Sequence, residues 1–180
     1  MLDFSNSKIL IVGDVMLDKY YFGKVDRISP EAPVPIVNIQ KEESRLGGAS
    51  NVANNIVSLG GHSLLCGVIG HDLFGKEIER ISRHKNIDTF LLKTSSPTIT
   101  KARIIGGKQQ IVRVDYEDKS ELNADNKKLF RDTISRILPE YDILVISDYG
   151  KGLISEDLCR YLIKLAHKYD KKVIIDPKGK

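Results

Sequence analysis

Short apolar runs alternate in this chain with stretches whose apolar residues recur at helical spacing. The clearest runs are residues 8–13 (KILIVG), 142–146 (DILVI) and 172–175 (KVII). Strands that are buried on both faces have this composition, and parallel strands need helices to join them. The alternation therefore predicts βαβ units and an α/β fold with a doubly wound, mostly parallel sheet.

Cap and turn residues set the expected boundaries of the elements. Gly60 ends one helix, Asp72 and Ser155 cap two others, and Pro139 stops a fourth. The expected helices cover residues 49–59, 73–84 and 125–138 and a segment that begins at Ser155. The expected strands cover residues 8–13, 34–40, 63–69, 87–93, 99–105, 108–115, 142–146 and 172–175.

Two parts of the chain do not fit this alternation. The strand at 34–40 is entered through several prolines, which suit an edge strand rather than a central one. The strands at 99–105 and 108–115 are separated by Gly106-Gly107, which we expect to form a two-residue hairpin turn. These segments predict a small β lid, built from about residues 19–40 and 98–115, over one end of the sheet.

Size and composition exclude several classes of protein. A chain of 180 residues with 41% hydrophobic and 29% charged residues fits one soluble domain, or part of a larger one. It has no apolar run of the roughly 18 residues that span a membrane. The net charge of +4 is spread out, which argues against nucleic acid as a partner. Cys66 and Cys159 are far apart, so we expect buried free thiols in a cytoplasmic protein. The histidines show no metal-binding spacing.

The segment Gly47-Gly48-Ala49-Ser50-Asn51 is the strongest candidate for a binding site. Two glycines allow a close approach of another group, and the helix that follows points its free N–H groups back at the turn. Asn51 adds a side chain that both donates and accepts hydrogen bonds. The segment fits the floor of a site for a hydroxyl-rich or anionic small molecule, and it fits a plain strand-to-helix turn equally well.

Polar residues follow two of the expected strands. Asp14 and Asp18 come after the first strand, and Asp148 and Lys151 follow the strand at 142–146. Ligands of open α/β sheets bind at the carboxyl ends of strands, where a carboxylate can hold sugar hydroxyls and a lysine can hold a phosphate. The alternatives are turn-capping aspartates and a surface lysine.

Lys101 and Arg103 lie two residues apart in the expected hairpin and therefore share one face of it. If the hairpin is a lid, these two cations reach an anionic substrate. Otherwise they belong to a solvated strand face.

Several motifs together resemble those of the ribokinase/PfkB family of carbohydrate kinases. The first signature of that family is matched by Gly47 to Ala53, Gly60 and Gly70. The chain is most similar to one branch, the kinase domains of bacterial D-glycero-β-D-manno-heptose-7-phosphate kinases. That similarity lies in GDVMLD (13–18), RISPEAPVP (27–35), PTITK (97–101), SDYGKG (147–152) and DPKG (176–179).

The resemblance implies a ribokinase-like fold and a sugar-phosphate kinase. Such an enzyme uses ATP and Mg²⁺ to phosphorylate heptose 7-phosphate at its anomeric hydroxyl, and the product feeds ADP-heptose and lipopolysaccharide synthesis. The family pattern places the sugar on Asp18, Gly47, Gly48 and Asn51, with Asp14 and Asp148 nearby. Lys101, Arg103 and Lys151 are candidates for the 7-phosphate. The lid is expected to form a homodimer contact.

One part of the family pattern is missing from the chain. The second family signature, which carries the catalytic base, lies beyond Lys180. We therefore expect residues 1–180 to be the N-terminal portion of a kinase domain, without the ATP-binding portion, without a catalytic residue of their own and with negligible activity. We also expect an apolar sheet edge to be exposed near 8–13 and 172–175.

Two other functions remain open at this point. The chain fits another PfkB-type kinase that acts on a neutral sugar or a keto-sugar acid. It also fits a non-catalytic remnant that binds a sugar phosphate or oligomerises through the lid.

Overall fold

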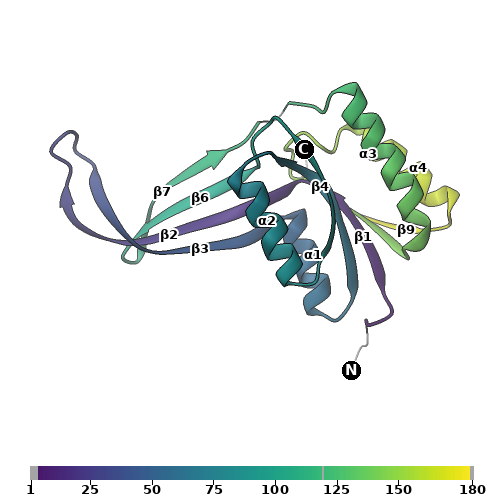
Figure 1. Cartoon of the computed structure of the whole chain (residues 1–180), viewed down its shortest axis with the longest axis horizontal. Helices are drawn as coiled ribbons and strands as arrows, with labels where there is room; N and C mark the ends of the chain where they lie inside the picture. The colour runs from purple at the N-terminus through teal and green to yellow at the C-terminus, as the bar shows by residue number, and fades with distance from the viewer. Residues whose placement is uncertain (1–3, 119, 179–180) are drawn as a thin grey trace.

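The computed structural model describes residues 4–118 and 120–178, which form two β-sheets flanked by helices (Figure 1). The central sheet has five strands in the order β5-β4-β1-β8-β9, and each neighbouring pair is parallel. This confirms the predicted mostly parallel sheet. The strands are β1 (Lys8–Gly13), β4 (His62–Gly70), β5 (Asp88–Thr94), β8 (Ile143–Ser147) and β9 (Lys172–Asp176).

Helices cover both faces of the central sheet, as its apolar strands require. The helices α1 (Ala49–Ser58) and α2 (Leu73–His84) pack on one face with Ile11 and Leu65. On the other face, α3 (Ala124–Ile137) and α4 (Glu156–Lys168) pack with Leu10 and its neighbours. A short 3₁₀ helix, η1 (Leu138–Glu140), contains Pro139 and follows α3 directly. The structure therefore confirms the doubly wound α/β arrangement.

The second sheet is the lid, with the strand order β3-β2-β6-β7. Its strands are β2 (Val15–Ile28), β3 (Pro35–Gly48), β6 (Thr100–Gly106) and β7 (Gln109–Tyr116). The strands β2 and β3 have fourteen residues each and form the long arm at the left of Figure 1.

The lid corrects two expectations. The strand predicted at 34–40 continues to Gly48, because polar residues in its second half pair across to β2, as Glu42 does with Lys19 at 2.9 Å. The hairpin turn is formed by Gly107 and Lys108, one residue later than predicted, and Gly107 takes the positive φ of 63°.

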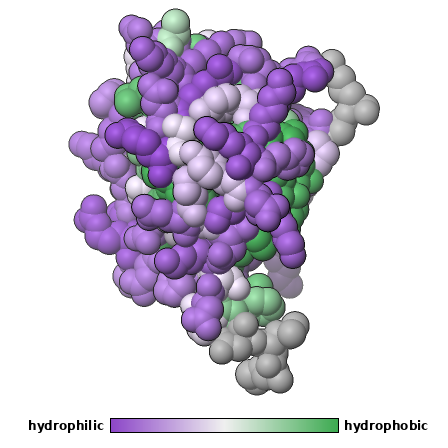
Figure 2. All heavy atoms as spheres, turned by 90° about the vertical axis from the view of Figure 1, so that its right-hand side faces the viewer, coloured by the Kyte–Doolittle hydropathy of each residue, from purple (hydrophilic) through white to green (hydrophobic). Residues whose placement is uncertain are grey.

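The edges of the central sheet differ in part from the expectation. The strand β1 is central and is paired on both sides, so the prediction that residues 8–13 lie near an exposed edge is wrong. Within the described residues β9 pairs only with β8, and Ile174 and Ile175 are 54% and 40% exposed. On the side of the molecule that Figure 2 shows, hydrophobic atoms gather along one flank of a mostly hydrophilic surface.

Three other expectations concern single residues and membrane spans. Both cysteines are free, but only Cys66 is buried, and Cys159 is half-buried. Burial raises the pKa of the Cys66 thiol, which keeps it protonated. In the part of the chain that the structure describes, no helix is long and apolar enough to cross a membrane.

Asp72 caps α2, as the sequence predicts, and it also holds the segment that leads into β6. Its carboxylate accepts the N–H of Gly75 at 2.8 Å and both the N–H and the hydroxyl of Thr98 at 2.7 Å. Burial opposes ionisation of Asp72, but these hydrogen bonds outweigh it, so the pKa of Asp72 lies below its ordinary value.

We expect Asp72→Ala to lower the free energy of unfolding by about 2 kcal/mol, since it removes a helix cap and the bonds to Thr98. Because the folded pKa is depressed, this stabilisation is present above about pH 4 and is lost as the pH falls through the folded pKa. Urea denaturation at several pH values measures it. Asn123→Ala, which removes a cap with one bond to Asn126, is expected to cost about 1 kcal/mol without this pH dependence. Equal losses at neutral and at acidic pH for Asp72→Ala would contradict the assignment.

Candidate functional site

The strand order places a crevice beside β1. The chain runs from β1 to β4 and β5 on one side and later to β8 and β9 on the other, so the order reverses between β1 and β8. Ligands of doubly wound sheets bind at such a switch point, outside the carboxyl ends of the strands. Asp14 alone separates β1 from β2, so the lid starts directly at this crevice.

A cavity of about 690 Å³ lies between the base of the lid and the N-terminus of α1, and we call it the lid cavity. Its walls come from β2, β3, β6, α1, the end of α2 and the loop after β8. The structure brings six of the nine predicted site residues to this one cavity. These six are Asp18, Gly47, Gly48, Asn51, Lys101 and Arg103.

The Gly47-Gly48 turn forms part of the cavity wall and needs both glycines. Gly48 has φ 55° and ψ −137° and precedes the first residue of α1. A Cβ atom on Gly47 would lie 2.5 Å from Oδ2 of Asp18, closer than real Cβ atoms come to a neighbour. The Ser50 hydroxyl donates to the carbonyl oxygen of Gly47 at 2.6 Å and fixes the turn. The segment is a tight turn, and it also brings its backbone against a carboxylate that lines the cavity.

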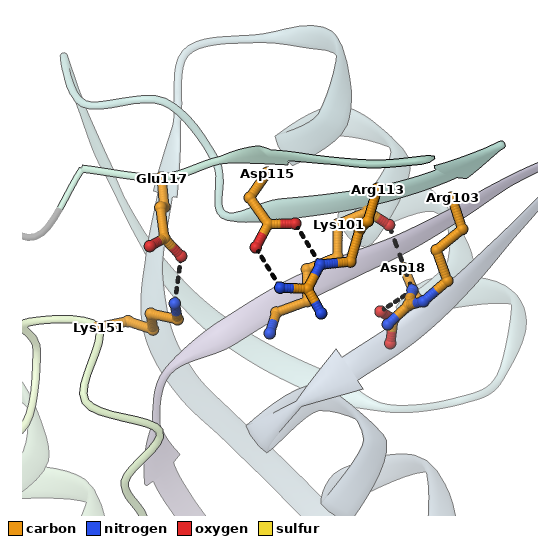
Figure 3. A network of polar contacts seen from close by, with 7 residues as sticks. All are labelled: Asp18, Lys101, Arg103, Arg113, Asp115, Glu117 and Lys151. Atoms are coloured by element: carbon orange, nitrogen blue, oxygen red, sulfur yellow. Dashed lines mark hydrogen bonds and ion pairs between the residues drawn. The ribbon is translucent and has the colours of Figure 1, made fainter. Parts of the chain in front are cut away.

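Asp18 is held by a cation from the neighbouring strand (Figure 3). Arg103 donates from Nη1 to Oδ1 of Asp18 at 2.7 Å and to the carbonyl oxygen of Lys101 at 3.3 Å. Its guanidinium also lies 5.1 Å from the centre of the Tyr20 ring. Burial opposes the charge on Arg103, but the bond to Asp18 and its negative charge raise the pKa of Arg103 overall. Arg103 therefore fixes the Asp18 carboxylate.

Lys101 has a different environment from Arg103. The register of β2 with β6 sets Lys101 beside Asp18, and its side chain lines the cavity. Among the described residues, the ammonium group of Lys101 forms no ion pair (Figure 3). In that part of the chain, the cavity lining contains four basic side chains and one carboxylate, that of Asp18. The basic residues are Arg45, Lys85, Lys101 and Arg103. The cavity is therefore positively charged and favours an anionic ligand.

The other three predicted residues do not line the lid cavity. Lys151 forms an ion pair with Glu117, as Figure 3 shows, and its side chain is only 9% exposed. It lines a smaller cavity of about 210 Å³, together with Asp14. The carboxylate of Asp148 accepts the N–H of Gly150 at 2.7 Å and lines neither cavity.

Asp14 is buried, with 1% of its surface exposed. Its carboxylate accepts the N–H groups of Tyr149 at 2.9 Å and Lys151 at 3.1 Å. Burial raises the pKa of Asp14; the backbone N–H groups partly oppose the rise, and the negative charge of Asp148 adds to it. The structure places Asp14 beneath the loop that follows β8 rather than in the wall of the lid cavity.

Sequence reasoning missed several residues of the lid cavity, among them Arg45, Lys85 and Tyr149. Arg45 faces Asp18 only because β2 pairs with the extended part of β3, and local sequence patterns did not predict that pairing. Tyr149 lies within the SDYGKG motif, but the prediction considered only the charged residues of that motif. An aromatic side chain in a loop after a parallel strand is the signal that was available.

A divalent metal does not fit the described residues. In residues 4–118 and 120–178, no three His, Cys, Asp or Glu side chains gather where they could hold a metal ion. Mg²⁺ prefers several oxygen ligands, usually including one or two carboxylates, and Asp18 in the lid cavity is already paired with Arg103. We therefore derive no step that runs through a metal.

A model of the pfkB family of carbohydrate kinases matches residues 6–180. The chain belongs to the pfkB family of carbohydrate kinases. It is 47% identical over 175 residues to the bifunctional protein HldE of a Helicobacter pylori strain, and 43% identical over 172 residues to HldE of a Nitratiruptor species. Each match covers 96% of this chain but only 38% and 37% of the relative. The chain thus spans less than two fifths of these relatives.

Solved structures of sugar kinases share the fold. Phosphofructokinase-2 from Escherichia coli in complex with fructose-6-phosphate has a TM-score of 0.72 at 20% identity, and the match covers 97% of this chain and 55% of that one. A carbohydrate kinase from Agrobacterium tumefaciens has a TM-score of 0.70 at 17% identity, covering 94% and 53%. The predicted ribokinase-like fold is confirmed.

Proposed function

We propose that this chain forms the acceptor-binding side of a sugar-phosphate kinase. The proposed reaction transfers a phosphoryl group from ATP to the anomeric hydroxyl of D-glycero-β-D-manno-heptose 7-phosphate and gives the 1,7-bisphosphate. Membership of the pfkB family supports the kinase class, and the motifs at 13–18, 27–35 and 147–152 support the heptose. The observation that carries the proposal is a fixed carboxylate in one cavity beside a lysine that has no ion pair among the described residues.

Asp18 and Asn51 are suited to hold the sugar. A carboxylate accepts hydrogen bonds from hydroxyl groups, and these charge-assisted bonds are stronger than neutral ones. Arg103 occupies Oδ1 of Asp18, which leaves Oδ2 beside Gly47 to accept a hydroxyl. Asn51 can both donate and accept, so it suits a hydroxyl that does both. We propose that the sugar ring lies on the Gly47-Gly48 turn.

Lys101 is our candidate for the 7-phosphate. It is the best placed of the three predicted cations, because Arg103 is paired with Asp18 and Lys151 is paired with Glu117. An ammonium group that no carboxylate of the described chain neutralises is available to bind a phosphate as a point charge. This arrangement favours a phosphorylated substrate over the neutral sugar that a different PfkB-type kinase would take.

Titration calorimetry with heptose 7-phosphate and with the dephosphorylated heptose tests the proposal. We expect the 180-residue chain to bind the phosphorylated sugar at least about tenfold more tightly, since one phosphate contact is worth about 1.4 kcal/mol or more. Lys101→Met should remove most of this preference and leave the affinity for the neutral heptose unchanged. Equal affinity of the wild type for the two sugars would favour the kinase of a neutral sugar, and no binding of either sugar would refute the proposal.

We further propose that residues 1–180 alone transfer no phosphoryl group. Phosphoryl transfer needs the nucleotide, the metal and a base positioned together, and the carboxylate in the lid cavity is paired with Arg103. ATP and Mg²⁺ would act in the complete kinase. An ADP-release assay with heptose 7-phosphate is expected to give no signal above background, and clear turnover would contradict this statement. Binding without turnover would also fit a sugar-phosphate-binding remnant.

We propose a homodimer that forms through the lid. The residues Val112, Val114 and Tyr116 alternate along β7 and are exposed on one face of the lid, and Val25 lies on the same face beside Gly106. An exposed apolar patch of this kind is typical of a contact surface. Sedimentation velocity should find a dimer, and a monomer at all concentrations would contradict this proposal. The two free cysteines support a cytoplasmic location, where thiols stay reduced.

A further inference from the structure

Asp14 connects three segments that meet at the switch point of the sheet. Its N–H donates to the carbonyl oxygen of Ser147 at 3.1 Å, and its carbonyl oxygen accepts the N–H of Ala49 at 2.9 Å. Its carboxylate accepts the N–H groups of Tyr149 and Lys151 at 2.9 and 3.1 Å. One residue thus joins the end of β8, the start of α1 and the loop after β8.

The Asp14 carboxylate is buried without a cation. With 1% of the residue exposed, no basic side chain of the described residues pairs with it, because Lys151 turns its ammonium group to Glu117. Its bonds go to main-chain N–H groups, including that of Leu153 at 3.4 Å. A buried acceptor that is satisfied in this way fixes the path of the chain that supplies the donors.

The segments that Asp14 joins carry two walls of the lid cavity. Ala49 directly follows the Gly47-Gly48 turn, and Tyr149 lines the cavity from the loop after β8. Asp14 holds the first wall through its main chain and the second through its carboxylate. The relative position of the two walls therefore depends on this one side chain.

We propose that Asp14 is a positioning residue, which sets the position of Tyr149 relative to the Gly47-Gly48 turn without touching the sugar. The proposal rests on the proposed function, since it assigns the lid cavity to the sugar phosphate. It replaces a direct role for Asp14 with an indirect one. The loop is ordered by an acceptor beneath it, so the cavity is already shaped before the ligand binds.

Amide hydrogen exchange tests the proposal in the wild-type chain. The N–H groups of Tyr149 and Lys151 lie in a loop, outside any helix or strand, and are bonded to Asp14. We expect them to exchange at least about tenfold more slowly than an unstructured chain. Exchange at the unstructured rate would overturn the proposal, whatever the variants do.

The variant Asp14→Asn keeps the shape of the side chain but turns a donor NH₂ group toward donor N–H groups. We expect exchange at Tyr149, Lys151 and Leu153 to accelerate at least about tenfold, while Val12 and Ile146 in the adjoining strands keep their rates. Asp142→Asn is the matched control, because Asp142 also accepts one main-chain N–H, that of Lys8, far from the cavity. Acceleration of all amides alike, or of none, would overturn the positioning role.

Calorimetry with heptose 7-phosphate completes the test. Asp14→Asn should weaken binding at least about tenfold and leave the preference for the phosphorylated over the neutral sugar intact, because Lys101 is untouched. A loosened loop with unchanged affinity would overturn the role of Asp14 in the site. If the wild type binds neither sugar, the proposed function fails, and the exchange rates alone then decide whether Asp14 orders the loop.

Discussion

Asp18→Asn is expected to weaken the binding of heptose 7-phosphate at least about a hundredfold, which corresponds to about 3 kcal/mol. The substitution removes the charge that strengthens the bonds to sugar hydroxyls, and each such bond contributes about 1.5–3 kcal/mol. It also leaves Arg103 without its partner at 2.7 Å and frees its side chain to move. Titration calorimetry of the two chains measures the effect.

The matched control for this prediction is Asp115→Asn. Asp115 also pairs with an arginine on the same lid sheet, Arg113, at 2.8 Å (Figure 3), but it does not line the lid cavity. Its loss should leave the affinity within about twofold of the wild type, because exposed ion pairs contribute little. A comparable large loss in both variants would show that general lid charge, rather than Asp18 itself, holds the ligand.

Gly48→Ala is expected to lower the free energy of unfolding by about 3 kcal/mol or more. The backbone of Gly48, at φ 55° and ψ −137°, lies in a region that side chains disfavour. A Cβ atom there would also overlap the carbonyl oxygen of Asp14, which is backbone and has little room to move. Urea denaturation measures the loss.

Gly107→Ala separates the two causes of this effect. Gly107 also has a positive φ, 63°, but a Cβ atom there would meet nothing within 4 Å. It should therefore cost only the conformational penalty of about 1 kcal/mol. If the two substitutions cost the same, the close approach of Asp14 to Gly48 does not constrain the turn.

The elements of the central sheet could be predicted because local signals specify them. The helix α2 has the predicted bounds, since Asp72 caps it and its apolar residues recur on one face. The strands β1 and β8 were visible as short apolar runs. The order of the strands was less accessible, and the error about β1 shows why. Position in a sheet depends on pairing with distant strands, which a local pattern does not record.

The site could be predicted only in part, because its chemistry depends on pairing between distant side chains. Asp18, Gly47 and Lys101 were found from motifs and do meet in one cavity. Local patterns could not distinguish Lys101 from Arg103, since both lie on one strand face. The difference arises when Arg103 bonds Asp18, 85 residues earlier in the chain, and Lys101 does not.

The long arm of the lid begins and ends at neighbouring points of the body. The chain leaves the sheet after Gly13 and returns to it at Ala49, where the N–H of Ala49 bonds the carbonyl oxygen of Asp14 at 2.9 Å. The hairpin of β2 and β3 is therefore an insertion whose two ends are closed on each other. Adding or removing matched pairs of residues at its tip would change the reach of the arm by about 3.4 Å per pair. Evolution or design can thus adjust how far this lid extends without altering a single contact of the α/β body.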